Sequence, residues 1–107
     1  MSVVDIEKVD GIAISSDDDS RLILLITDHL DWTNEYEHLL QLQNKINAYI
    51  SFLESEQYRD IYPEKQFSTY SIEIHFKFEM TSNCIKLIET INKQLSANNI
   101  LIEALES

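Results

Sequence analysis

The densest group of chemically capable side chains lies between Asp28 and His38, in the stretch DHLDWTNEYEH. Glu35 and His38 stand three residues apart, which places a carboxylate and an imidazole on one helix face, as in carboxylate-bridged di-iron bundles. Those bundles need a second such pair and two further glutamates, and the chain repeats neither. The candidate metal ligands are Asp28, His29, Asp31, Glu35 and His38. The alternative is a strand-to-helix corner whose carboxylates cap the helix, and because it accounts for the same residues we expect no metal, cofactor or catalytic residue.

Three consecutive aspartates, Asp17 to Asp19, invite a calcium interpretation. The EF-hand pattern requires a glycine at its sixth position and a glutamate at its twelfth. Counted from Asp17, those positions hold Leu22 and Asp28. The pattern fails, so a solvated turn is expected.

The stretch Glu56–Gln66 is predicted to be a loop that carries residue types typical of protein interfaces. Tyrosine and arginine anchor interfaces more often than other residues, and the loop contains Tyr58, Arg59 and Tyr62. The alternative is that one of the tyrosines seals the end of the core, as we expect of Trp32. The predicted partner-binding residues are Asp17, Asp18, Asp19, Tyr58, Arg59 and Tyr62.

Scarce residue types exclude several kinds of chemistry. The chain has one glycine, Gly11, and one cysteine, Cys84. A dinucleotide fingerprint, a P-loop and a nucleophile elbow all need more glycines. A disulfide framework or a multi-cysteine zinc site needs more cysteines, so Cys84 is expected to be a small buried hydrophobe.

The charge of the chain restricts its partners. Nineteen acidic residues stand against eight basic ones, giving a net charge of −11. Such a surface repels nucleic-acid phosphates and anionic membranes but attracts a basic protein. The first ten residues lack the pattern of a signal peptide, and the longest apolar run, Leu22 to Ile26, cannot span a bilayer. We therefore expect a cytoplasmic protein with a basic protein partner.

Two hydrophobic periodicities alternate along the chain and predict its elements. Period two is clearest in Tyr70–Glu79, where apolar and polar residues alternate, whereas three- and four-residue spacings mark two helices. The expected strands are Val9–Ser15, Arg21–Asp28, Tyr70–Glu79 and Ile100–Leu105. The expected helices are Asn34–Ser55 and Ser82–Ala97. This β-β-α-β-α-β order predicts a single α+β domain over residues 1–107, a two-layer sandwich with both helices on one face of a four-stranded sheet.

Three segments resemble a known family. Ile26–Trp32 reads ITDHLDW and Glu37–Ser55 reads EHLLQLQNKINAYISFLES, while Ile72–Lys77 reads IEIHFK. They are similar to a set of small bacterial proteins, a domain of unknown function, that share T-I-S-D-H-L-D-W followed by E-H-L-x-x-L-Q-x-K-x-N-x-Y. The serine of the first motif is absent here. The resemblance implies a bacterial, cytosolic protein with no established activity.

Together these observations favour a non-catalytic protein-binding module. Its sharpest form is a toxin-neutralising immunity protein, by analogy with other small acidic proteins of this build. One alternative is a small metal-dependent enzyme that uses the residues between Asp28 and His38. Another is a self-associating module that forms a homodimer through its open sheet face or an edge strand.

Overall fold

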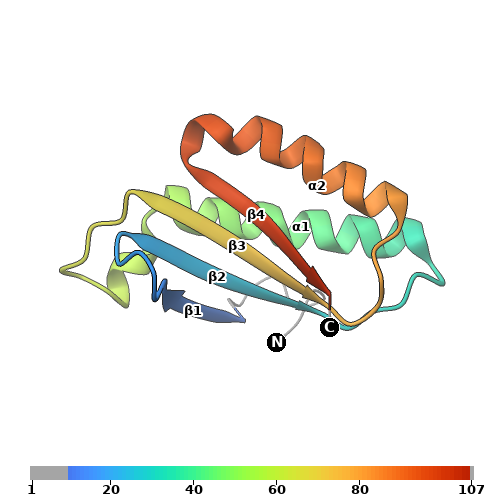
Figure 1. Cartoon of the computed structure of the whole chain (residues 1–107), viewed down its shortest axis with the longest axis horizontal. Coiled ribbons are helices and arrows are strands. Elements are labelled where there is room, and N and C mark those ends of the chain that lie inside the picture. The colour runs from blue at the N-terminus through green and yellow to red at the C-terminus, as the bar shows by residue number, and fades with distance from the viewer. Residues whose placement is uncertain (1–9, 107) are drawn as a thin grey trace.

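The computed structural model describes residues 10–106, which form a sheet covered by two helices (Figure 1). The predicted α+β architecture and the β-β-α-β-α-β order are confirmed. The strands are β1 (Gly11–Ile14), β2 (Arg21–Asp28), β3 (Thr69–Phe76) and β4 (Ile100–Glu106). The helices are α1 (Glu35–Glu54) and α2 (Ser82–Leu95), with the short 3-10 turns η1 (Gln57–Asp60) and η2 (Ser96–Asn98). Neither α1 nor α2 combines the length and the apolar character that crossing a membrane requires.

The four strands lie side by side in the order β1-β2-β3-β4. β1 and β2 form the expected antiparallel hairpin, while β2, β3 and β4 run parallel. Parallel neighbours need a crossover, and here each crossover is a helix. Both helices therefore start at the edge where β2 and β3 end, and both lie on the same side of the sheet (Figure 1).

The core fills the space between the sheet and the helices. Along β2, Leu22, Leu24 and Ile26 are fully buried against the helices, while the alternate residues face the other side and are less buried. On the helix side, the predicted stripe of α1 supplies Leu42, Ile46, Tyr49 and Leu53. The period-two and period-3.6 patterns thus point to the same interface.

The ends of the elements differ from expectation where pairing or backbone geometry decides them. Strand β3 stops at Phe76 instead of Glu79, because its neighbours end at the register partners Asp28 and Glu106. Helix α2 tightens into η2 and stops at Asn99, whose φ of 61° is left-handed. Val9, assigned to the first strand, lies outside the described residues.

The two helices are capped differently at their starts. At α2, the Thr81 hydroxyl accepts a hydrogen bond from the backbone N–H of Cys84 at 3.2 Å. At α1, which carboxylates are expected to cap, the N-cap is Asn34 and its side chain makes no capping hydrogen bond. The start of α1 is instead fixed by the residues around His38.

Candidate functional site

Asp28, the last residue of β2, and His38, near the start of α1, form a buried pair. Asp28 is 1% exposed and His38 is 3% exposed. The His38 Nε2 atom lies 2.7 and 2.6 Å from the two carboxylate oxygens of Asp28. The other ring nitrogen, Nδ1, lies 3.0 Å from the backbone oxygen of Asp31. We call Asp28, Asp31, Trp32 and His38 the corner.

The hydrogen bonds of His38 define its protons. A carbonyl oxygen only accepts, so Nδ1 must donate to Asp31. Nε2 faces a carboxylate, so a second proton lies between Nε2 and Asp28. Both ring nitrogens are therefore engaged within the chain, Nδ1 with the backbone oxygen of Asp31 and Nε2 with the Asp28 carboxylate. A histidine held in this way has to break one of these hydrogen bonds before it can ligate a metal or act as a general base.

Trp32 covers the pair, as expected for a residue that seals the core. Its ring stacks on the His38 ring with centroids 3.7 Å apart and planes 21° apart. The Asp28 carboxylate also accepts the backbone N–H of Leu30 at 3.1 Å. The hydrogen bonds between Asp28 and His38 join the end of β2 to the first turn of α1, with the ring of Trp32 stacked on one of the two partners.

The remaining candidate ligands of this stretch point elsewhere. His29 is exposed, and the Asp31 carboxylate accepts the backbone N–H of Thr33 at 3.1 Å, which holds the pKa of Asp31 below its usual range. Glu35 accepts a hydrogen bond from Asn83 at the start of α2, 3.2 Å away. Among residues 10–106, no three histidine, cysteine, aspartate or glutamate side chains are grouped as metal ligands.

Cys84 has the environment of a structural cysteine. It is fully buried beneath the start of α2. Burial, followed by the nearby carboxylates of Asp28 and Glu35, raises the pKa of the Cys84 thiol to about 12. Because the thiolate is the reactive form, this thiol is a poor nucleophile near neutral pH.

A second buried ion pair lies further along α1, where sequence analysis placed no site. Lys45 is fully buried, and its Nζ lies 3.2 Å from the carboxylate of Asp10. The same carboxylate accepts the backbone N–H of Thr27 at 2.9 Å. The Tyr49 hydroxyl accepts the N–H of Asp10 at 2.7 Å and donates to the carbonyl of Leu25 at 2.6 Å, and burial raises its pKa. Asp10 and Tyr49 thereby satisfy backbone groups of Thr27 and Leu25 near the end of the pairing between β1 and β2.

The two groups of predicted partner-binding residues lie at one end of the molecule. The turn between β1 and β2, with Asp17 to Asp19, and the segment between α1 and β3 both lie at the left of Figure 1. The backbone N–H of Ser68 donates to Ser20 at 2.8 Å, and the two serine hydroxyls are 3.0 Å apart. Segments about 40 residues apart in the chain thereby share one surface.

We call this surface the acidic end. It is defined by the exposed carboxylates of its two segments, which are Asp17, Asp18, Asp19, Glu56, Asp60 and Glu64. The exposed bases of the same segments are Arg59 and Lys65, and Arg59 already pairs with Glu56 at 3.0 Å. Hydrogen bonds from the side chain and backbone of Ser20 lower the pKa of Asp18 and favour its charged form.

The loop residues divide differently from the prediction. Tyr58 is only 4% exposed, and its ring packs against Phe67 and Tyr70, so it belongs to the core and offers no exposed ring to a partner. Tyr62 is partly buried against Phe67. Sequence analysis missed Ile61, which is 51% exposed beside them. Nothing in the sequence around Ile61 indicates that this apolar side chain points outward.

Comparison with known proteins assigns a family. A family model described as a family of unknown function, DUF6572, matches residues 1–106. The chain belongs to DUF6572. This agrees with the resemblance to a domain of unknown function, and DUF6572 carries no assigned activity. No curated protein and no solved structure matches the chain.

Proposed function

We propose that this chain is a non-catalytic binding module that holds a basic protein through its acidic end. The observation that carries the proposal is that two segments distant in the chain, which together carry six exposed carboxylates, meet at one end of the molecule (Figure 1). The second segment also carries the exposed side chain of Ile61. Charge of one sign accelerates the encounter with a partner of the other sign. An apolar side chain beside these charges can lose its water after contact, and this slows dissociation of the complex.

Backbone strain supports a role for this surface. Glu56 follows α1 with a φ of 60°, in the left-handed region that favours glycine or asparagine. Such a conformation costs a bulkier residue about 1–2 kcal/mol. A carboxylate is nevertheless held there, exposed, at the start of the loop. Strained residues concentrate at functional sites, where the position of the side chain matters more than local stability.

The sharpest form of the proposal is a bacterial, cytoplasmic immunity protein that neutralises a basic toxin domain. Nucleases and other toxins that act on nucleic acids carry basic surfaces, because they must approach phosphates. An acidic protein can cover such a surface without any catalytic group of its own. The charge of −11 suits this role.

The competing enzyme hypothesis has less support. It relies on the five residues between Asp28 and His38, and three of them have other contacts or face solvent. The two that meet, Asp28 and His38, bond to each other and to the backbone. The sequence offers these two residues as ligands or bases, but here their hydrogen bonds are made within the chain.

The proposal is tested by capture and by matched charge variants. Immobilised protein is incubated with lysate from its source cells, and retained proteins are eluted with increasing salt. The partner is expected to be basic and to elute early. Its affinity is then measured for a variant in which Asp17, Asp18 and Asp19 become asparagine. The control variant changes Glu37, Glu79 and Glu89, exposed residues elsewhere, to glutamine.

Both variants lose three charges, so net charge alone weakens them equally. A local acidic interface predicts at least tenfold weaker binding in the aspartate variant and a much smaller loss in the control. Equal losses would mean that only net charge matters and would contradict the proposed site. Retention of acidic partners alone would contradict the function.

A further inference from the structure

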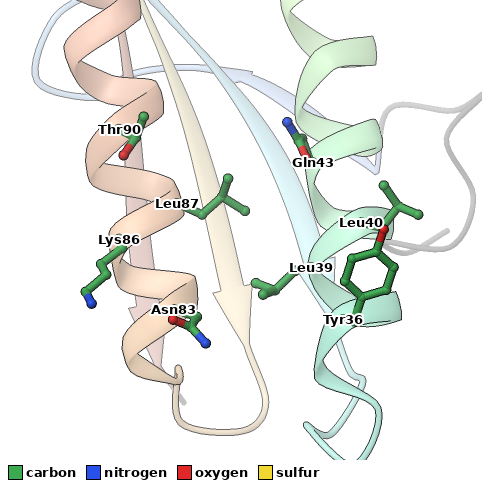
Figure 2. Close-up of a pocket in the computed structure, with 8 residues that line it drawn as sticks. All are labelled: Tyr36, Leu39, Leu40, Gln43, Asn83, Lys86, Leu87 and Thr90. Atoms are coloured by element: carbon green, nitrogen blue, oxygen red, sulfur yellow. The ribbon is translucent and has the colours of Figure 1, made fainter.

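A groove lies between α1 and α2, away from the acidic end. Its volume is about 410 Å³, and it lies between the first halves of the two helices. Figure 2 shows Leu39 of α1 and Leu87 of α2 pointing toward each other across it. We call this the helix groove, and the residues that line it are Tyr36, Leu39, Leu40, Gln43, Asn83, Lys86, Leu87 and Thr90.

The helix groove has an exposed apolar border. Tyr36 is 77% exposed and Leu40 is 39% exposed, and both stand on the outer side of α1 in Figure 2. Two of the seven large exposed apolar side chains among the described residues thus line the helix groove. Exposed apolar groups that gather around a groove are typical of a contact with another protein.

The charge of the helix groove indicates what kind of protein makes this contact. None of the eight lining residues is acidic, and one, Lys86, is basic, although acids outnumber bases by 19 to 8 in the whole chain. The carboxylate of Glu35 at its end is bonded to Asn83. Two copies of a chain with a charge of −11 repel each other wherever their carboxylates meet, so they can associate only where carboxylates are scarce. The helix groove meets this requirement, and it leaves the acidic ends outside the contact.

A competing surface for self-association is protected. The edge strand β4 presents the backbone of Ile102 to the outside, where another strand could pair. The side-chain amide of Asn92 occupies both groups: it donates to the Ile102 carbonyl at 3.1 Å and accepts the Ile102 N–H at 2.8 Å. This blocks strand addition at the centre of β4.

We infer that two copies of this chain associate through their helix grooves, with the exposed side chains of Tyr36 and Leu40 of each copy packed against the helices of the other. The helix groove and the exposed side chains of Tyr36 and Leu40 lie on the same face of one molecule. In a dimer with a two-fold axis, each copy can therefore place these side chains against the helices of the other. The dimer presents two acidic ends, and it does not depend on the proposed function.

Salt separates this inference from the proposed function. Binding between an acidic end and a basic partner weakens as salt rises, because salt screens attraction. An apolar contact between two acidic copies strengthens as salt rises, because salt screens their repulsion. The two associations are therefore expected to respond to salt in opposite directions, and either can fail without the other.

Sedimentation velocity of the purified chain, from about 10 μM to about 1 mM, tests the inference at low salt and at about 0.5 M NaCl. We expect a mass that rises from monomer toward dimer with concentration, and more so at high salt. Leu40→Glu and Tyr36→Ala are expected to weaken dimerisation at least tenfold. Both positions are exposed on a helix, so circular dichroism is expected to show an unchanged fold.

The matched control is Leu101→Glu, which places the same charge on an equally exposed leucine of the open sheet face. It is expected to weaken the dimer only by the small amount that the added net charge causes. A chain that stays monomeric at about 1 mM in high salt overturns the inference and leaves the groove to a different protein. A dimer lost in Leu101→Glu and kept in Leu40→Glu moves the contact to the sheet and also overturns it.

Discussion

The corner and the acidic end are both rich in charged residues and use them in opposite ways. In the corner, the Asp28 carboxylate is 1% exposed, and a histidine and a backbone N–H occupy its oxygens. At the acidic end, Asp17, Asp18 and Asp19 are exposed, and two bases stand against six acids. Charges whose partners lie within the chain stabilise the fold, whereas charges left facing water are available to another molecule.

The largest expected effect comes from breaking the corner pair. We predict that His38→Ala lowers the free energy of unfolding by about 3–5 kcal/mol, because it leaves a buried carboxylate without its partner. Urea unfolding measures the loss. His29→Ala, at an exposed position in the same stretch, is expected to change stability by less than about 0.5 kcal/mol. A small loss in His38→Ala would mean that water reaches Asp28 and that the corner is open.

A double variant sharpens this prediction. Replacing Asp28 and His38 together with leucines removes both charges, so it is expected to cost less than His38→Ala alone. With Asp28→Leu and His38→Leu also measured singly, the departure of the double variant from the sum of the two single costs measures the coupling. Costs that simply add would show that the pair is not coupled.

The second largest effect concerns the acidic end. Ile61→Ala is expected to raise the dissociation rate of the partner, equivalent to about 1–3 kcal/mol if the side chain is desolvated in the complex. Its effect on folding stability is expected to be small, because Ile61 is half exposed. Tyr62→Ala is expected to act in the same direction on dissociation. Surface plasmon resonance separates the rates, and unchanged dissociation in both variants would move the interface elsewhere.

Much of this architecture follows from the sequence, and the corner shows where sequence analysis stops. Period two in β3 and the three- and four-residue spacings of the helices identify the sheet, the helices and the core face, because one side of each element must be buried. The spacing of Glu35 and His38 places both in the first turn of α1. It cannot show that Asp28, at the end of β2, comes within 2.6 Å of His38 while Glu35 turns to α2.

The buried pair of Lys45 and Asp10 was less predictable still. A lysine in the middle of a helix is normally exposed, and Asp10 lies 35 residues earlier in the chain. Their contact depends on how far β1 extends along β2, which local patterns do not specify. The acidic end was predictable in composition but not in detail, since only the fold shows that Tyr58 points inward and Ile61 outward.

A smaller effect is expected from the pH dependence of stability through Cys84. Its pKa is about 12 in the folded chain, above the ordinary value near 8.5 that applies after unfolding. The folded state therefore keeps the proton where the unfolded chain loses it. This contribution is fully present below about pH 8.5 and is lost above it, by up to about 1.4 kcal/mol per pH unit. Comparison of urea unfolding between the wild type and Cys84→Ala at rising pH isolates it, and parallel curves would contradict burial of the thiol.

The smallest expected effect is that of added metal. Calorimetric titration of metal-free protein with Zn²⁺, Mn²⁺ and Fe²⁺ is expected to show no binding at micromolar affinity, because both nitrogens of His38 are occupied. Micromolar binding that His38→Ala abolishes would overturn this expectation. The corner would then be a functional site, and the enzyme hypothesis would replace the binding module.

The most direct test of the account is the association rate of the basic partner across a range of salt concentrations. Binding at the acidic end predicts fast association that slows as salt rises, since screening at physiological salt limits interactions between exposed charges to about 8 Å. In the variant with Asp17, Asp18 and Asp19 changed to asparagine, association is expected to be slower at low salt and less sensitive to salt, with folding stability unchanged. Equal salt dependence in the wild type and the variant would contradict the claim that the acidic end is where the partner binds.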